Sequence, residues 1–474
     1  MYSALLAAAL FATPPQTPPA AQSPAVPATF FARNTTRVES WRFFEPRPGG
    51  GDPHYAFIAN RLLFGARHTG RRWHFQGAGQ YVQFGHLPQR AFGPGPLGTG
   101  GAYYDASRDA ASRQLYLKYL NATIKGLAPG LDIQAGRFGY ASGAEAFSGV
   151  PKIEAVKRQR VDSRLIGEFE WSIYQRSFDG VRTDWRRGRY QLTGAWFRPT
   201  QGGFEEDANV HVREVNVAVA ALTAKPGRWL PHTESQVFVY HYDDNRLVHA
   251  RPDNSGMPAA AVDVAVTTAG GTLVTAWPSG FDTLLWAAAQ TGDWYGQDHR
   301  AWSLAAEAGY QWNDATWKPW VRAGINASSG DGAPGDAGHR TFFQMLPTAR
   351  KYSLSAVYTQ MNLRDLFLQA LLRPSGALSI RADLHRLDLM QRADRWYFGS
   401  GITQRTGAGF GFGTRASTNE KAFGTVLEGA AEYTFNPNWS LNGYAGWIRG
   451  AGVVQRLFAA QNLTFFYIEN LLQF

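Results

Sequence analysis

The chain has 474 residues, among them 51 Gly, 16 Trp, 20 Tyr and 30 Phe but no Cys. Its 47 Lys and Arg residues outnumber 37 Asp and Glu residues, which gives a formal net charge of +10. An apolar content of 44% excludes a disordered chain. The lack of Cys excludes disulfides, thiolate metal sites, a cysteine nucleophile and a lipoprotein anchor. After the N-terminus, no apolar stretch approaches the ~20 residues of a membrane helix.

Residues 1–28 are predicted to be a signal peptide followed by a leader rich in Pro and Ala. The segment opens with MYSALLAAALFA, whose apolar core is too short to span a membrane, and small residues around Ala20 and Ala25 suit cleavage. No charged residue precedes Arg33, which indicates a weak signal or a start codon placed slightly off. An ordinary disordered N-terminus is the alternative.

From about residue 30 onward, apolar and polar residues alternate, as in half-buried strands. Residues 302–312 have Trp at both ends and apolar side chains at every even position, with Ser, Glu, Gly and Gln among the odd ones. Residues 439–447 are bracketed by Trp in the same way. A soluble β-sandwich also alternates, but aromatic residues at both ends of segments of ~10 residues, opposite a polar face, are typical of a membrane barrel.

Eighteen such segments occur along the chain, and an even number suits a barrel whose two termini lie on the periplasmic side. Tight connections at 186–188, 313–315 and 436–438 contrast with long ones rich in Gly and Pro. We therefore predict an all-β, antiparallel transmembrane β-barrel of about 18 strands over residues 30–474, with long extracellular loops and short periplasmic turns. The segments begin near Asn34, Tyr55, Trp73, Arg113, Leu131, Arg176, Tyr190, Val210, Glu234, Val262, Phe281, Ala301, Trp317, Leu363, Leu378, Gly424, Trp439 and Asn462. The long connections are 86–112, 141–175, 246–260, 329–361 and 391–423.

The C-terminus favours the bacterial outer membrane. Counting back from Phe474, every second residue to Phe466 is predicted to face outward, and the chain ends on an aromatic side chain. This resembles the signal that outer-membrane proteins present to the barrel assembly machinery. Outer-membrane lipid and lipopolysaccharide are therefore expected partners.

Several separated motifs closely resemble the alginate export family of outer-membrane barrels. They occur in the family's order from about Phe30 to Phe474, and Gly136-Arg137 also fits. The motifs are RSFDGVR at 176–182, GDWYGQDHRAWSLAAEAGY at 292–310, ASSGD at 327–331, TFFQMLPT at 341–348, NLRDL at 362–366, LRP at 372–374 and RADLH at 381–385. The resemblance implies a monomeric barrel of eighteen strands with a basic pore, which in the namesake passes a polyuronate outward. The chain departs from the pattern at Phe138-Gly139, where members commonly carry Gln-Glu.

Strand parity identifies candidate pore residues. Because Val181 and Trp185 are predicted to face lipid, Arg176, Arg182 and Asp184 should face the pore. The full set of predicted pore-lining, substrate-binding residues is Lys118, Arg137, Arg176, Arg182, Asp184, Arg322, Arg381, Asp383, His385 and Glu469. Arginine can bind a carboxylate bidentately, and interspersed acids keep such binding weak enough for conduction.

Several of these assignments carry alternatives. Parity places Arg137 with the lipid-facing side chains of its strand, so either a bulge turns it inward or it sits above the membrane. Parity also places Lys118 opposite Leu117 and Tyr119. Each basic residue is about as well explained by a structural ion pair in the lumen, such as Arg182 with Asp184 or Arg381 with Asp383.

The segment VPKIEAVKRQRV at 150–161 is a basic run with Lys152, Lys157, Arg158 and Arg160. These residues could fold into the barrel mouth and collect anions. A solvated charge run in a long loop is the favoured interpretation.

The sequence gives little support to phosphate binding, metal binding, nucleic-acid binding or catalysis. The chain has no phosphate-binding Gly loop followed by Lys-Ser or Lys-Thr and no HExxH spacing. The basic residues are spread along strands rather than clustered as in nucleic-acid binders. We predict no catalytic step, no cofactor, no metal and no nucleic acid.

The sequence therefore predicts a passive outer-membrane channel for an anionic polysaccharide or oligosaccharide, working with periplasmic export partners. The main alternative is an anion-selective porin for uptake of small sugar acids. Two further alternatives are a barrel enzyme of the outer membrane and a secreted, soluble glycan-binding β protein.

Overall fold

The computed structural model describes residues 28–93, 100–204, 208–348, 354–355, 357–407 and 409–474. The predicted leader, residues 1–28, lies outside the described residues except for its last one. Among the residues that the structure describes, no helix is both long enough and apolar enough to cross a membrane.

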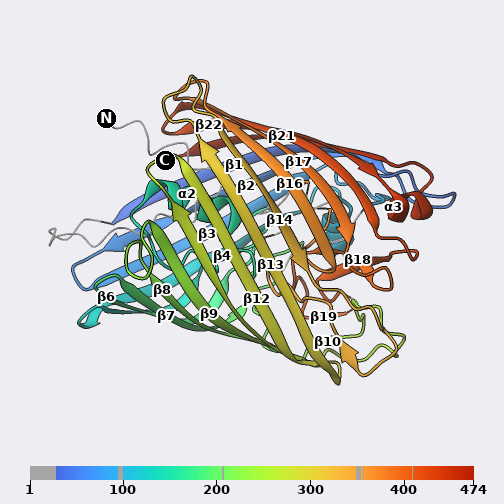
Figure 1. The fold of residues 1–474 in the computed structure, drawn as a ribbon, viewed down its shortest axis with the longest axis horizontal. Coiled ribbons are helices and arrows are strands. Elements are labelled where there is room, and N and C mark those ends of the chain that lie inside the picture. Colours follow the sequence, from blue (N-terminus) through green and yellow to red (C-terminus); the bar gives the residue numbers. More distant parts are fainter. Residues whose placement is uncertain (1–27, 94–99, 205–207, 349–353, 356, 408) are drawn as a thin grey trace.

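Eighteen antiparallel strands of the described chain close into a barrel (Figure 1). Each strand pairs with its neighbour along the chain, and the first strand closes the barrel by pairing with the last. The barrel strands are β1 Thr29–Arg42, β2 His54–Thr69, β3 Trp73–Gly85, β4 Arg113–Ala128, β5 Leu131–Phe138, β6 Phe178–Arg187, β7 Tyr190–Pro199, β8 Val215–Ala224, β9 Thr233–Asp244, β11 Val264–Ala276, β12 Phe281–Trp294, β13 Gln297–Gln311, β14 Trp320–Ser328, β16 Leu363–Leu372, β17 Leu378–Leu389, β21 Ala422–Asn436, β22 Trp439–Gly450 and β23 Asn462–Gln473.

The remaining elements belong to the connections. Strand β15 pairs in parallel with the start of β13, and β10 pairs in parallel with β19, whereas β18 and β20 pair antiparallel. The short strands are β10 Leu247–Val248, β15 Gly338–His339, β18 Arg395–Gly399, β19 Thr406–Gly407 and β20 Phe412–Ala416, and the helices are α1 Gly100–Ser107, α2 Pro151–Arg160 and α3 Gly452–Leu457.

The two ends of the barrel differ. The C-terminus lies at the left in Figure 1, and the pairing of Arg33 with Gln473 places the start of β1 at the same end, together with short turns such as residues 188–189 between β6 and β7. The long connections that carry α3, β10 and β18 lie at the right. We call these the turn end and the loop end. In outer-membrane barrels, short turns face the periplasm and long loops face outside.

The predicted segments correspond one to one with the barrel strands. The predicted first residue is the observed one for nine strands, namely β3, β4, β5, β7, β12, β16, β17, β22 and β23. The largest differences are five residues, at β1, which begins at Thr29, and at β8, which begins at Val215. The even strand number is therefore confirmed, and long and short connections alternate except between β12 and β13, where residues 295–296 form a short connection at the loop end.

The barrel interior is filled by its own connections. Ile153 and Val156 of α2 are fully buried and cluster with Phe238, Tyr240 and Trp286, whose side chains point inward from β9 and β12. Burial of an apolar helix face against this wall, at ~25 cal/mol per Å² of apolar surface, favours keeping α2 inside the lumen. The outer face instead exposes its apolar side chains, as in Val237 and Val239 between the inward residues of β9.

Candidate functional site

The connection between β5 and β6 runs through the lumen as far as the turn end. Lys152 at the start of α2 donates to Gln311 Oε1 at 2.8 Å and lies 3.3 Å from Asp282 Oδ2. Gln311 is the last residue of β13, and Asp282 is the second residue of β12, so both lie at the turn end. Helix α2 therefore lies deep in the lumen.

This placement corrects the interpretation of residues 150–161 as a solvated charge run. Lys157 and Arg160 are 3% and 0% exposed. The Lys157 ammonium lies 2.7 Å from Glu234 on the wall. Buried wall carboxylates neutralise the basic helix, so its charges do not require water.

Helix α2 is fixed to the wall by an ion-pair cluster centred on Glu307 of β13. The Glu307 carboxylate lies 2.9 Å from Arg160 of α2 and 3.0 Å from Arg322 of β14, and Arg322 also pairs with Asp282. All four side chains are 0% exposed. Arg322, predicted to line the pore, is thus engaged in structural ion pairs.

A β-bulge turns both Lys118 and Tyr119 inward. In the pairing of β3 with β4, Ala78 faces Tyr119 while Gly79 faces Leu117, so Lys118 is the extra residue. Simple parity placed Tyr119 on the lipid side with Leu117, and the bulge corrects this. Lys118 and Tyr119 are 0% and 7% exposed.

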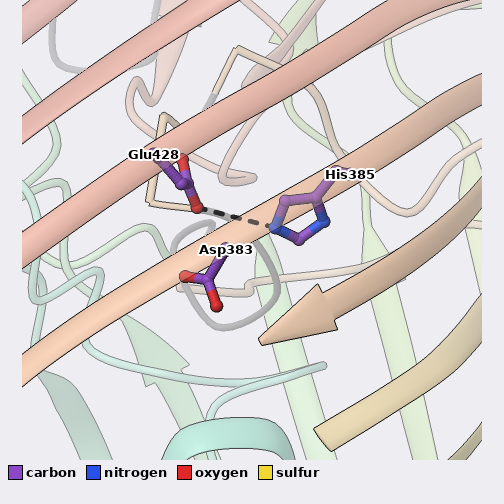
Figure 2. Close-up of side chains that lie close together, drawn as sticks. All are labelled: Asp383, His385 and Glu428. Atoms are coloured by element: carbon purple, nitrogen blue, oxygen red, sulfur yellow. Dashed lines mark ion pairs between the residues drawn. The ribbon is translucent and has the colours of Figure 1, made fainter. Parts of the chain in front are cut away.

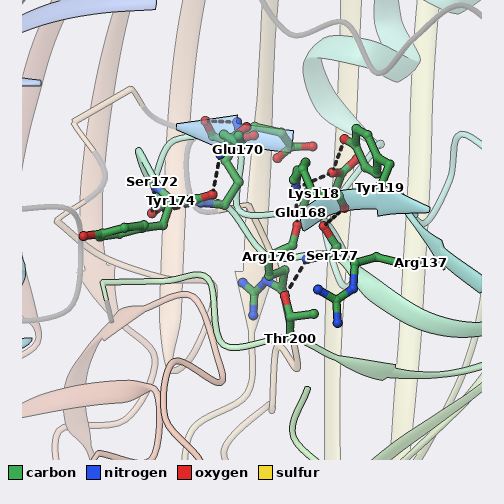
Figure 3. Close-up of polar contacts among 12 residues, drawn as sticks. Lys118, Tyr119, Arg137, Glu168, Glu170, Ser172, Tyr174, Arg176, Ser177 and Thr200 are labelled. Carbon is green, nitrogen blue, oxygen red and sulfur yellow. Dashed lines mark hydrogen bonds and ion pairs between the residues drawn. The ribbon is translucent and has the colours of Figure 1, made fainter. Parts of the chain in front are cut away.

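The bulge holds the returning part of the β5–β6 connection, as Figure 3 shows. The Glu168 carboxylate lies 2.8 Å from the Lys118 ammonium and accepts a hydrogen bond of 2.6 Å from the Tyr119 hydroxyl. Lys118 also donates to the Arg176 carbonyl. Lys118, one of the predicted pore residues, thus faces the lumen and anchors a loop.

Replacing Lys118 by Met is expected to destabilise the folded barrel by about 3–5 kcal/mol, because Glu168 stays buried without its cation. The measurement is the temperature at which the folded, fast-migrating form is lost in heat-modifiability electrophoresis. Lys125→Met, on the same strand but partly exposed near the turn end, is the matched control. An unchanged transition in Lys118→Met would contradict the assignment.

Arg176 and Arg137 lie elsewhere than predicted. Strand β6 begins at Phe178, so Arg176 belongs to the connection. Its guanidinium donates to the carbonyl groups of Ser400, Ile402 and Pro347, which joins three connections inside the barrel.

Arg137 lies on the outer face near the loop end, so its assignment as a pore residue is corrected. It pairs in register with Leu120, which is 47% exposed, while the next residue, Phe138, is buried inside. The register is regular, so no bulge turns Arg137 inward. Its guanidinium forms a bidentate pair with Asp179 at 2.6 and 2.7 Å. Of the two alternatives for Arg137, the position outside the lumen is the one observed.

The remaining predicted residues face the lumen in pairs. Arg182 lies 2.8 Å from Asp184, and Arg381 pairs with Asp383, so both structural ion pairs considered as alternatives are present. His385 of β17 lies 2.9 Å from Asp365 of β16. Arg381, Asp383 and His385 share one strand face, and the last predicted residue, Glu469, lies on β23.

Sequence reasoning missed the arginines of β1 and β2. We call Arg33, Arg37, Arg61 and Arg67 the arginine column. The register places Arg61 opposite Thr35, between Arg33 and Arg37, and parity places Arg67 inward near the turn end. The sequence does contain a signal for these residues. Arg33 and Arg37, like Arg61 and Arg67, are an even number of residues apart, so each pair lies on one face of its strand.

The arginine column is anchored at its inner end and more exposed toward the turn end. Arg37 lies 2.8 Å from Glu469 and donates to the Trp171 carbonyl at 3.0 Å. Arg61 donates to the Ser172 carbonyl at 3.2 Å. Arg37 is 3% exposed and Arg61 is 8% exposed, whereas Arg67 is an exposed residue. The column therefore places guanidinium groups at successive depths of the lumen, with Arg37 held in ion pairs at the inner end and Arg67 exposed at the turn end.

The chain matches a known protein family and resembles several solved structures. The family model for alginate export matches residues 32–447. The solved structure of OccK2 (OpdF) from Pseudomonas aeruginosa in complex with glucuronate is similar with a TM-score of 0.55, 9% identity, and coverage of 94% of this chain and 98% of that one. The structure of P. aeruginosa OpdK with vanillate gives a TM-score of 0.56, 8% identity, and coverage of 94% and 99%. The structure of P. aeruginosa OccK5 (OpdH) gives a TM-score of 0.52 and 11% identity, and the similarity covers 94% of this chain and 98% of that one.

A search of curated protein sequences finds no significant match. At such low identities the structural similarities establish the fold, which is that of outer-membrane porins. The family match and the porin-like fold together indicate an outer-membrane channel. The chain belongs to the alginate export family and forms a β-barrel channel of the bacterial outer membrane.

Proposed function

We propose that this channel is anion-selective and passes saccharides that carry carboxylates, with an anionic polysaccharide or oligosaccharide as the first candidate. The arginine column is the observation that carries the proposal. The family assignment supports a polymeric substrate, and export of a polymer would involve periplasmic partners at the turn end.

The column suits stepwise transfer of a carboxylate. A planar guanidinium can bind a carboxylate through two parallel hydrogen bonds. Diagonal neighbours on adjacent strands lie about 7–8 Å apart, so a uronate released by one arginine is within reach of the next. Glu469 and Glu39, which pair with Arg37 at 2.8 and 3.2 Å, compete with the substrate and keep each binding step weak.

Uptake of small sugar acids is the second candidate, and the position of α2 favours it. The β5–β6 connection fills much of the lumen, so a polymer chain would have to displace it, whereas a single sugar ring needs less space. The glucuronate complex of OccK2 (OpdF) supports a small acidic sugar as substrate class.

The test is single-channel current in a planar bilayer, with a polyuronate, free glucuronate or a neutral glucan added to one side. We expect the polyuronate to interrupt an anion current at lower uronate concentration than the monomer, because several carboxylates engage the column together. Block by the monomer alone would favour the uptake porin. Equal block by the neutral glucan would contradict both candidates.

A further inference from the structure

Two carboxylates face each other directly inside the barrel wall. Asp383 of β17 pairs in register with Glu428 of β21, and each residue is 2% exposed. Like charges placed opposite each other on adjacent strands are destabilising. His385 comes next on the same face of β17 and points toward this pair, as Figure 2 shows. A cation between the three side chains would offset this repulsion.

Two potential ligand atoms in this group have no hydrogen-bond partner among the described residues. They are Nε2 of His385, in a residue only 1% exposed, and Oδ1 of Asp383. His385 Nε2 lies 3.6 Å from Glu428 Oε1, which is too long for a hydrogen bond. A proton on Nε2 would therefore lack an acceptor at hydrogen-bond distance. Arg381 pairs with the other oxygen of Asp383, Oδ2, and leaves Oδ1 available.

Neighbouring residues hold the side chains of His385 and Glu428 in fixed orientations, as is usual for metal ligands. His385 Nδ1 lies 2.9 Å from the Asp365 carboxylate, which fixes the ring and directs Nε2 inward. Glu428 accepts hydrogen bonds from the backbone N–H groups of Leu354 and Ser355 at 2.8 and 3.0 Å, and from the Tyr444 hydroxyl at 2.9 Å. Metal-bound histidines usually have such a carboxylate partner on the other ring nitrogen.

We propose that Asp383, His385 and Glu428 bind a divalent transition-metal ion, with Zn²⁺ as the best-suited ion. One ligand atom from each residue lies within 4.8 Å of the others, and the side chains would draw closer together around an ion bound at about 2.0–2.2 Å. The imidazole ligand favours Zn²⁺ over Ca²⁺ and Mg²⁺, which prefer oxygen ligands alone. Three protein ligands leave a fourth position for water.

The ion would join β17 to β21 and, through Glu428, to the backbone of residues 354–355 in the β14–β16 connection. It would also offset the repulsion between the facing carboxylates, of which Asp383 is paired with Arg381. This site is separate from the arginine column, so its failure would leave the proposed channel function intact.

The test uses the full-length barrel, folded in detergent without an affinity tag and titrated with Zn²⁺ alone. Elemental analysis after gel filtration gives the stoichiometry, and X-ray absorption at the zinc edge identifies the ligands. We expect one Zn²⁺ per barrel, with one imidazole among its ligands. His385→Gln should abolish binding at this site, and Asp365→Asn should weaken it by roughly 10- to 100-fold, as loss of a residue that orients a metal ligand does.

His339→Gln is the matched control, because His339 is also buried and lies beside His299, with 2.8 Å between their Nδ1 atoms. Unchanged binding in this variant supports the proposal. Folded wild-type barrel that retains no Zn²⁺ would overturn the proposal whatever the variants do. Binding that survives His385→Gln but is lost in His339→Gln would also overturn it and would assign the ion to the histidine pair.

Discussion

Replacing Glu307 by Gln is expected to raise the single-channel conductance of the barrel severalfold. Glu307 is the shared partner of Arg160 on α2 and Arg322 on the wall, and none of the three side chains is exposed. Removing one partner of a buried ion pair costs about 3–5 kcal/mol, because the remaining charge stays buried and unpaired. Undocking of α2 returns Arg160 to water and removes part of that cost. The undocked population should therefore rise by roughly 10²–10³-fold.

Glu420→Gln is the control for this variant. Glu420 pairs with Arg456 near the loop end at 2.8 Å, but both side chains are substantially exposed, so loss of the pair costs at most about 1 kcal/mol. The control should conduct like the wild type. Heat-modifiability electrophoresis verifies that both barrels are folded. Unchanged conductance in a folded Glu307→Gln barrel would mean that α2 does not obstruct the pathway.

Neutralising three members of the arginine column is expected to reduce anion preference strongly. We choose the triple variant Arg33→Gln, Arg61→Gln and Arg67→Gln, which leaves the anchored Arg37 in place. A cleft lined by one sign of charge raises the local concentration of counter-ions by about 10-fold or more. The ratio of anion to cation permeability, measured at 0.1 M salt, should fall by roughly tenfold. The effect should shrink at 1 M, where the Debye length is about 3 Å.

The matched control removes the same charge from the outer face of the barrel. Arg300, Arg364 and Arg386 lie near the loop end with side chains that are 77%, 49% and 49% exposed. Their triple replacement by Gln should leave selectivity unchanged. An equal loss of selectivity in both triple variants would indicate an effect of net charge rather than of the lumen.

The barrel itself arises from local sequence signals. Alternation has a period of two residues, and each strand carries its own pattern, so the starts of strands such as β12 and β22 are encoded locally. The alternation of short and long connections fixes which end of the barrel is which. The alternation pattern does not predict a β-bulge. One extra residue at Lys118 reverses which face the later residues of β4 occupy, without changing the composition of the strand.

The filled lumen was harder to predict, because its contacts join residues far apart in the chain. The helix α2 does carry a signal. Proline stands at its first position, and Ile153, Val156, Lys157 and Arg160 have the spacing of one helix face. Two residues on that face are basic, which predicted that the face would be exposed to solvent. The face is compatible with burial only because Lys157 pairs with Glu234 and Arg160 pairs with Glu307.

The candidate metal ligands depend on strand register in the same way. Asp383 and His385 are two residues apart, but Glu428 comes from another strand after a long connection. No spacing motif links it to them. Sequence parity could place all three side chains inside the barrel, whereas only the pairing of β17 with β21 brings them together.

The most direct test of the anion-selective channel is the potential at zero current for the wild-type barrel in a planar bilayer under a KCl gradient. The arginine column predicts a potential with the sign set by chloride, and its magnitude should decrease in the Arg33, Arg61 and Arg67 triple variant. A potential of the opposite sign, set by potassium, or a folded barrel that carries no current, would contradict the account.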